Sequence, residues 1–345
     1  MKFRNEREVV EYTRTYLNEL DFSDDFVITG ATGLIGTALI QVLLVLRKER
    51  NSNFKIYALC RNETKLKQQF GEEVIFISYN LLEPIECTFA RANIIHAAAP
   101  TSSDRFLNDS YNVSNEIVAS TKHISDFSIR SNASTLTFLS TLEIYGEPKI
   151  TKPLKENDYF GLDPLNSRNS YAISKQLSEN TLSFLMKKTN IKTNILRLSQ
   201  VFGPAKDIDD QRVIFYFARQ VSREEDIILK TSGSTVRNYI YYLDMISALL
   251  HLIRRDCGNT VEVYNVAHPD TIISIYDLAC AFSDRSNKIK VKIQEMDNTG
   301  YRDEIYLAMD VSKLVKTGWH PVFDLDACID AILFDMSILA NNSKI

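Results

Sequence analysis

The sequence predicts an α/β fold in which helices cover both faces of a doubly wound parallel sheet. Short apolar runs typical of strands alternate with helical patterns through the first part of the chain. The predicted strands are residues 26–29, 54–59, 74–77, 93–96, 136–139 and 193–198. This alternation is typical of a parallel doubly wound sheet, so we expect at least six parallel strands.

The first predicted strand leads directly into a glycine-rich turn. Gly30-Ala31-Thr32-Gly33-Leu34-Ile35-Gly36 follows residues 26–29, and a helical pattern continues from there. Gly30 permits a tight turn, Gly33 lets backbone amides approach a pyrophosphate, and Gly36 lets the helix lie close to the strand. The order of strand, glycine turn and helix therefore predicts a dinucleotide-binding site.

A tyrosine and a lysine at helical spacing predict hydride-transfer chemistry. Tyr171 and Lys175 are four residues apart and share one face of a helix, so the ammonium can stabilise a tyrosinate that removes a substrate proton. Thr141 stands at the end of the strand that the apolar run 136–139 predicts. Its hydroxyl should therefore lie at the carboxyl edge of the sheet, where α/β folds bind ligands.

These segments together resemble the extended short-chain dehydrogenase/reductase family, in particular its NAD(P)-dependent nucleotide-sugar epimerases and dehydratases. The resemblance covers roughly residues 26 to 335. Three further segments support it: the small-residue stretch from Ile94 to Pro100, the block from Arg197 to Pro204, and the segment 233–244. The second block departs from the family pattern at two positions, with Gln200 for Asn and Phe202 for Tyr.

The resemblance implies a Rossmann-type domain and a smaller C-terminal mixed α/β lobe. We expect the dinucleotide-binding domain over residues 26–200 and a mainly substrate-binding lobe over 201–345, with some elements of the second part returning to the first. Residues 1–25 predict an added N-terminal helix, since Val9, Tyr12, Tyr16 and Leu20 recur at helical spacing. This helix either covers an edge of the domain or serves as a dimer-contacting or regulatory arm.

The resemblance also implies which residues contact the cofactor. They come from the glycine turn, the ends of the second and third strands, the small-residue stretch and the Tyr-Lys pair: Gly30, Thr32, Gly33, Leu34, Ile35, Gly36, Arg61, Asn80, Leu81, Ala97, Ala98, Ala99, Tyr171 and Lys175. Arg61 stands where NAD-specific members carry an acid, so it favours NADP over NAD. Asn80 stands where the family often has an Asp.

The implied substrate is a nucleoside-diphosphate sugar. Arg237 and Arg302 match family arginines that pair with nucleotide phosphates, and two guanidiniums suit a diphosphate. Gln200 is a further expected substrate contact. The alternative for both arginines is an ordinary surface ion pair.

The choice of reaction depends on the residues after Thr141. Tyr171 and the cofactor would oxidise the sugar at C4, and Glu143 would then act as a second acid or base, or orient a substrate hydroxyl, or cap a turn. Leu142 lacks the acid that a standard 4,6-dehydratase uses. Epimerisation, decarboxylation, dehydration and NADPH-dependent reduction of a keto sugar remain open, as does a non-catalytic dinucleotide-binding sensor or scaffold.

Composition and charge agree with this class and exclude others. The net charge of −4 and the dispersed basic residues argue against a nucleic-acid partner. Five separated cysteines without a ligand cluster predict reduced thiols, no metal and a cytoplasmic protein. The longest apolar run is far below the ~20 residues that span a bilayer. The resemblance further implies a homodimer and a place in the synthesis of cell-surface polysaccharide precursors.

Overall fold

The computed structural model describes residues 6–100, 103–204, 210, 212–256, 261–294 and 305–342. The chain forms two compact units. The first comprises Met1–Gly146, Tyr159–Leu198 and Ile246–Tyr264, and the second comprises Glu147–Asp158, Ser199–Met245 and Asn265–Ile345. The chain therefore returns to the first unit with Ile246–Tyr264, after it has passed through Ser199–Met245 of the second unit.

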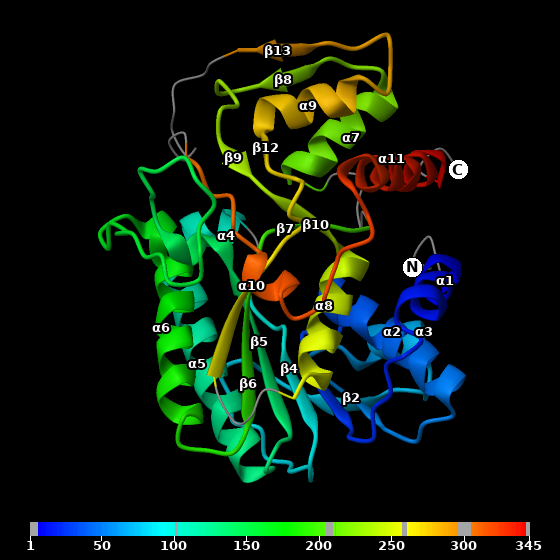
Figure 1. Ribbon diagram of the computed structural model, residues 1–345, viewed down its shortest axis with the longest axis vertical. Helices are drawn as coiled ribbons and strands as arrows, with labels where there is room; N and C mark the ends of the chain where they lie inside the picture. The colour runs from blue at the N-terminus through cyan, green and yellow to red at the C-terminus, as the bar shows by residue number, and fades with distance from the viewer. Residues whose placement is uncertain are drawn as a thin grey trace. The chain divides into compact units, whose positions relative to one another are not determined.

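A seven-stranded sheet forms the centre of the first unit (Figure 1). Its spatial order is β11-β6-β5-β4-β1-β2-β3. The strands are β1 (Phe26–Thr29), β2 (Ile56–Cys60), β3 (Ile75–Ser78), β4 (Asn93–His96), β5 (Thr135–Thr141), β6 (Lys192–Leu198) and β11 (Val261–Val266). The pairings from β3 through β6 are parallel. The expected doubly wound sheet is confirmed, and β11 adds an edge strand that the sequence patterns did not predict.

Helices cover both faces of this sheet because its crossovers run in opposite directions from the centre. The β1-to-β2 connection is α2 (Leu34–Arg50), and the β4-to-β5 connection contains α4 (Ser103–Asn108) and α5 (Ser110–Arg130). Right-handed crossovers in opposite directions place their helices on opposite faces. Figure 1 shows α5 beside α6 (Ser170–Met186) on one face, with α2, α3 (Glu63–Phe70) and α8 (Tyr242–Arg254) on the other.

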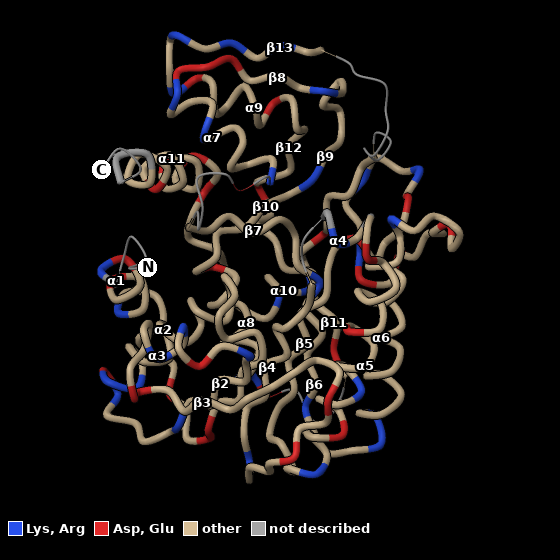
Figure 2. Tube along the Cα trace, turned by 180° about the vertical axis from the view of Figure 1, so that it is seen from behind, with Lys and Arg blue, Asp and Glu red and all other residues tan. Residues whose placement is uncertain are grey.

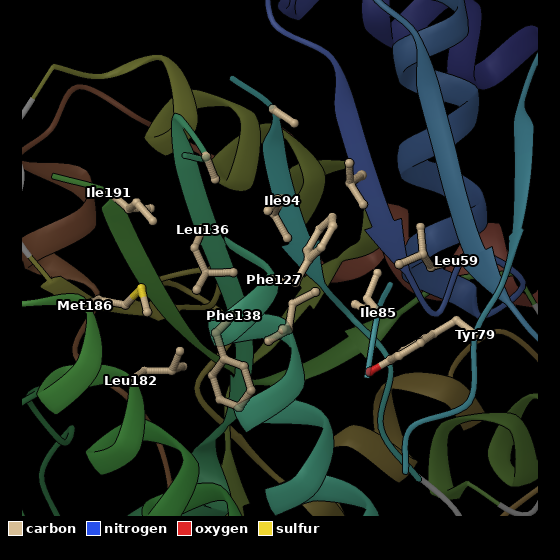
Figure 3. Packing of buried hydrophobic residues seen from close by; sticks show 14 of the residues in the cluster. Leu59, Tyr79, Ile85, Ile94, Phe127, Leu136, Phe138, Leu182, Met186 and Ile191 are labelled. Atoms are coloured by element: carbon tan, nitrogen blue, oxygen red, sulfur yellow. The ribbon is translucent and has the colours of Figure 1, made fainter. Parts of the chain in front are cut away.

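The core of the first unit lies between the sheet and the α5–α6 face. Ile94 of β4 and Leu136 and Phe138 of β5 pack against Phe127 of α5 and Leu182 of α6 (Figure 3). All five side chains are at most 1% exposed. This packing fixes α6, which carries Tyr171 and Lys175, against β5, which carries Thr141.

The N-terminal helix α1 (Glu6–Tyr16) packs along α2. Val9 and Tyr12 on its inner face are buried, and Arg14 forms a 2.7 Å ion pair with Glu49 of α2. Farther along, Phe22 packs edge-on against Phe26 at the start of β1. The helix thus covers an apolar surface of the first unit.

The second unit is a mixed α/β lobe built on three two-stranded pairs. The pairs are β7 (Gln200–Phe202) with β10 (Tyr239–Tyr241), β9 (Val236–Arg237) with β12 (Ile273–Ser274), and β8 (Ile227–Leu229) with β13 (Val291–Ile293). Helix α7 (Val213–Arg223) packs against α9 (Ile275–Ser283) and α11 (Leu325–Asn342). The short helix α10 (Ser312–Val315) completes the unit.

Basic and acidic residues are interspersed along the chain in both units (Figure 2). Among the described residues, no helix has the length and apolar character needed to cross a membrane.

Candidate active site

The glycine turn between β1 and α2 has the shape of a dinucleotide cradle. Gly30 has φ +70°, and a Cβ there would lie 2.8 Å from the carbonyl carbon of Ala97. A Cβ at Gly36 would lie 2.4 Å from the carbonyl oxygen of Gly30. Both positions therefore require glycine, because the backbone segments touch.

The N-terminus of α2 can receive an anion. Its N-cap, Gly33, supplies no side-chain cap, and the first turn carries no acidic residue. The amides of Leu34, Ile35 and Gly36 open this 17-residue helix, so a pyrophosphate would meet their N–H groups and the positive end of the helix dipole. The residues present therefore fit a dinucleotide.

The small-residue stretch after β4 lies against this turn. The backbone amide of Ala98 donates to Thr29 Oγ1 at 3.1 Å, and Thr29 Oγ1 lies 2.8 Å from Nδ1 of His96. Ala97, Ala98 and Ala99 are partly exposed. The ends of β1 and β4 are thus tied together by a buried threonine-histidine pair that the sequence motifs did not identify.

Arg61 lies just past the end of β2 with an exposed side chain, and no described residue pairs with it. The next acid, Glu63, forms a 2.9 Å ion pair with Lys67 on α3. Asn80, after β3, uses its side chain locally, since Nδ2 donates to Glu83 and Oδ1 accepts from the amide of Leu82. The Leu81 carbonyl accepts a 3.3 Å hydrogen bond from His123.

Thr141, Tyr171 and Lys175 come together at the carboxyl end of β5. The side chains of Thr141 and Tyr171 are hydrogen-bonded, and Tyr171 stacks on the Phe106 ring at 4.5 Å. Lys175 Nζ donates to the carbonyl of Leu139 at 2.8 Å and lies 4.5 Å from the centre of the Phe138 ring. The predicted triad therefore forms one cluster in the first unit.

Burial favours the neutral forms of both titratable groups in this cluster. It raises the pKa of Tyr171, as does the Glu143 carboxylate, while the hydrogen bond to Thr141 and the Arg168 cation act in the opposite direction. Burial lowers the pKa of Lys175 to about 8, against the opposing effect of Glu179. The buried ammonium of Lys175 therefore loses its proton more readily than that of a solvent-exposed lysine.

Glu143 lies beside this cluster in an ion pair. Its carboxylate is 3.1 Å from Arg168 Nη1, and its backbone amide donates to Thr141 Oγ1 at 3.2 Å. The Arg168 guanidinium lies over Phe106, the ring on which Tyr171 stacks. Leu142, by contrast, is buried in the core. Sequence reasoning missed Arg168, although it stands three residues before Tyr171.

Two of the expected substrate residues lie in the second unit. Arg237 is in β9, and its buried Nε has no hydrogen-bond partner among the described residues. Gln200 begins β7 and is partly exposed. Arg302 lies outside the described residues.

The described cysteines, Cys60, Cys87, Cys280 and Cys328, are free thiols. Within the described ranges, no group of three or more His, Cys, Asp or Glu side chains is arranged to hold a metal ion.

The fold and this cluster define a class of protein: a dinucleotide-dependent enzyme with a Tyr-Lys pair at the carboxyl edge of a Rossmann-type sheet. The model of the NAD dependent epimerase/dehydratase family matches residues 26–267. The chain belongs to this family, and the expected enzyme class is confirmed.

Curated relatives agree with this assignment, and solved structures share the fold. UDP-glucuronic acid decarboxylase 3 of Arabidopsis thaliana is 26% identical over 300 residues, covering 86% of this chain and 84% of the relative. The UDP-N-acetylglucosamine 4-epimerase of Methanobrevibacter ruminantium, solved with UDP-N-acetylmuramic acid, has a TM-score of 0.75 at 20% identity, covering 94% and 100% of the two chains. The UDP-glucuronic acid 4-epimerase of Bacillus cereus, solved with NAD, has a TM-score of 0.71 at 19% identity, covering 91% and 99%.

The contact between Gly36 and Gly30 generates a first prediction. Gly36→Ala forces a Cβ into the Gly30 carbonyl oxygen, so we expect it to lower the free energy of unfolding by about 2 kcal/mol or more and to weaken NAD binding. Gly161→Ala is the matched control, because no atom lies within 4 Å of its added Cβ; we expect a change within about 0.5 kcal/mol. Urea unfolding and NAD calorimetry measure both effects, and equal effects of the two substitutions would contradict the cradle.

The buried His96 generates a second prediction, on acid stability. Burial, together with the Lys175 cation, lowers its pKa to about 3, whereas an unfolded histidine titrates near 6.5. Below pH 6.5 the unfolded chain therefore binds a proton that the folded chain does not, and stability falls as the pH drops toward 3.

We expect the free energy of unfolding of the wild type to fall by about 3 kcal/mol more than that of His96→Gln between pH 7 and pH 4. Urea titrations at several pH values measure the difference. The matched variant at the exposed His320, His320→Gln, should follow the wild type. Parallel curves for wild type and His96→Gln would refute the account.

Proposed function

We propose that this chain decarboxylates a nucleoside-diphosphate sugar acid, with UDP-glucuronic acid as the first candidate, after oxidising the sugar at C4. The observation that carries the choice among family reactions is the Glu143–Arg168 ion pair beside Tyr171. A carboxylate and a guanidinium at the reacting end of the site suit a substrate that itself bears a carboxylate. The similarity to UDP-glucuronic acid decarboxylases supports the same choice.

Tyr171 would take the proton of the C4 hydroxyl. Its hydrogen bond to Thr141 orients the phenol and favours the tyrosinate. The Lys175 ammonium, one helical turn further along α6, would favour the tyrosinate as well. A dinucleotide held by the glycine turn would supply the hydride acceptor for C4 and, at the end of the cycle, the hydride donor. Thr141, Tyr171 and Lys175 thus serve every reaction of this family alike.

Arg168 and Glu143 would act on the neighbouring part of the sugar. Arg168 donates through Nη1 to Glu143, and its other guanidinium nitrogens have no hydrogen-bond partner among the described residues, so they can hold the C6 carboxylate. A C4 ketone makes the sugar a β-keto acid: the C5–C6 bond breaks, carbon dioxide leaves, and the electron pair passes to the ketone as an enolate. C5 then needs a proton, and Glu143 is the candidate acid/base that relays it from solvent.

Arg237 is the candidate ligand for the substrate diphosphate. A buried guanidinium nitrogen without a described partner is costly unless a ligand satisfies it, and a phosphate oxygen is a suitable acceptor. Gln200 and Arg302 remain proposed substrate contacts on the basis of the family resemblance alone.

The preference for NADP over NAD rests on Arg61, whose exposed guanidinium can pair with a 2′-phosphate. An NADPH-dependent reductase of a keto sugar is the second candidate function that this residue favours. For the decarboxylase we propose a cytoplasmic site of action in the synthesis of polysaccharide precursors.

The purified chain, supplied with UDP-glucuronic acid and NAD, is expected to release carbon dioxide and a UDP-pentose, which liquid chromatography with mass spectrometry detects. Tyr171→Phe should lower turnover by about 10²- to 10⁴-fold, since it removes the acid/base group. Arg168→Met should abolish the reaction, while Arg91→Met, at a side chain that is 77% exposed, should not change it. A product that keeps its carboxylate would identify an epimerase and overturn the proposal.

We also propose a homodimer that forms through α5 and α6. Leu177 and Phe184 lie seven residues apart on one face of α6 and are 49% and 62% exposed, and Tyr111 at the start of α5 is 80% exposed. A second copy of the same helix pair, related by a two-fold axis, can cover this apolar face with the same residues.

Sedimentation velocity tests the dimer. The wild type should sediment as a dimer and Phe184→Glu as a monomer, because the new charge would be buried in the interface. Phe334→Glu is the matched control on α11, where the phenylalanine is 49% exposed, and it should remain dimeric. A monomeric wild type would contradict the proposal.

A further inference from the structure

A buried ion pair lies one helical turn beyond Lys175 on α6. Arg197 of β6, 1% exposed, donates to Glu179 through Nε at 3.1 Å and Nη2 at 2.7 Å. Ser140 of β5 donates to the same carboxylate at 2.6 Å. Arg197 also donates to the hydroxyl of Tyr145 at 3.1 Å. We call Ser140, Glu179, Arg197 and Tyr145 the Glu179 cluster.

Lys175 and Glu179 are held by adjacent residues of the same strand. Lys175 donates to the carbonyl of Leu139, and Ser140, the next residue of β5, donates to Glu179. Because the two α6 residues are four apart, they share one face of the helix. Arg197 and Ser140 engage the Glu179 carboxylate, and no ion pair joins it to Lys175.

We propose that Glu179 is a positioning residue, which Arg197 and Ser140 hold close enough to Lys175 to keep its ammonium charged without capturing it in an ion pair. A lysine captured by Glu179 could not turn toward the tyrosine and the cofactor. A lysine without a nearby anion, 3% exposed in an apolar site, would lose its proton more readily. The Glu179 cluster avoids both outcomes.

Charged and titratable groups from several elements face this region. Two short 3-10 helices, η1 (Leu142–Tyr145) and η2 (Ser167–Asn169), pack against α6. The charged and titratable groups of the region are His96 of β4, Glu143 and Tyr145 of η1, Arg168 of η2, Arg197 of β6, and Tyr171 and Glu179 of α6 itself. Helix α5 meets α6 there through a Thr121–Ser178 hydrogen bond, with Glu116 paired to Arg105 and Lys122 paired to Asp126. Among these groups, Glu179 is the one that raises the pKa of Lys175 against the effect of burial.

The sign of the effect distinguishes this role from a purely structural one. Glu179→Gln removes the anion and leaves the Arg197 cation without its counter-charge. The loss of the attraction and the uncompensated cation both make the Lys175 ammonium less favourable. Glu179→Gln combined with Arg197→Met removes both charges and also relieves the unpaired buried guanidinium. The pKa of Lys175 should therefore be highest in the wild type, intermediate in the double variant and lowest in Glu179→Gln.

The titration of Lys175 tests this order without substrate. The protein is labelled with ¹³C at the lysine Cε, and the Lys175 signal is assigned by its loss in Lys175→Met. We expect the midpoint to fall by about one pH unit in Glu179→Gln. Glu49→Gln, which removes an arginine-paired carboxylate from α2, is the matched control and should leave the midpoint unchanged. An unchanged midpoint in Glu179→Gln, or a double variant below the single variant, would overturn the proposal.

The effect of Glu179 on the Lys175 pKa does not depend on the function proposed above, whereas its consequence for catalysis rests on that function. If UDP-glucuronic acid is turned over, the alkaline limb of kcat in Glu179→Gln should move to lower pH in step with the Lys175 midpoint. A limb that stays in place while the midpoint moves would refute the positioning role. Absence of turnover by the wild type would refute the proposed substrate and leave the Lys175 titration as the test of Glu179.

Discussion

The hydrogen bond from Lys175 to the carbonyl of Leu139 is the contact on which the candidate site depends. It joins α6 to β5 at the point where that strand ends, and Thr141 follows two residues later. A buried ammonium must find an acceptor, and this backbone oxygen supplies one without neutralising the charge. The helix register is thereby fixed, and Tyr171, one turn earlier, meets Thr141.

The surrounding core maintains this alignment. The α5–α6 face of the sheet is packed with Phe127, Leu182 and Phe138, so α6 has little freedom to shift along β5. Gln176 of α6 donates to the carbonyl of Ile144 at 2.7 Å, which holds the turn that carries Glu143. The residues that we propose for hydride exchange and the carboxylate that would direct the later step are therefore fixed by the same helix.

Much of this could be predicted from the sequence, because short-range rules govern it. The glycine turn was recognised from the seven consecutive residues Gly30 to Gly36, and Tyr171 and Lys175 are one helical turn apart. The Thr141 assignment needed only the end of an apolar run. The contacts of Arg168, Arg197 and His96 were not predicted, because their partners are 25, 18 and 67 residues away in sequence. Strand β11 was missed because the chain reaches it only after passing through the second unit.

In the proposed reaction the sugar is oxidised and reduced again at C4 during one catalytic cycle. Conversion of UDP-glucuronic acid that carries deuterium at C4 tests it most directly, with the position of the label read by NMR. The account predicts a UDP-pentose that retains deuterium at C4 and gains a solvent hydrogen at C5, with no net change in the oxidation state of the cofactor. Deuterium that accumulates in free reduced cofactor would contradict this cycle. So would decarboxylation without cleavage of the C4–hydrogen bond, which would show as the absence of both an isotope effect and deuterium transfer to the cofactor.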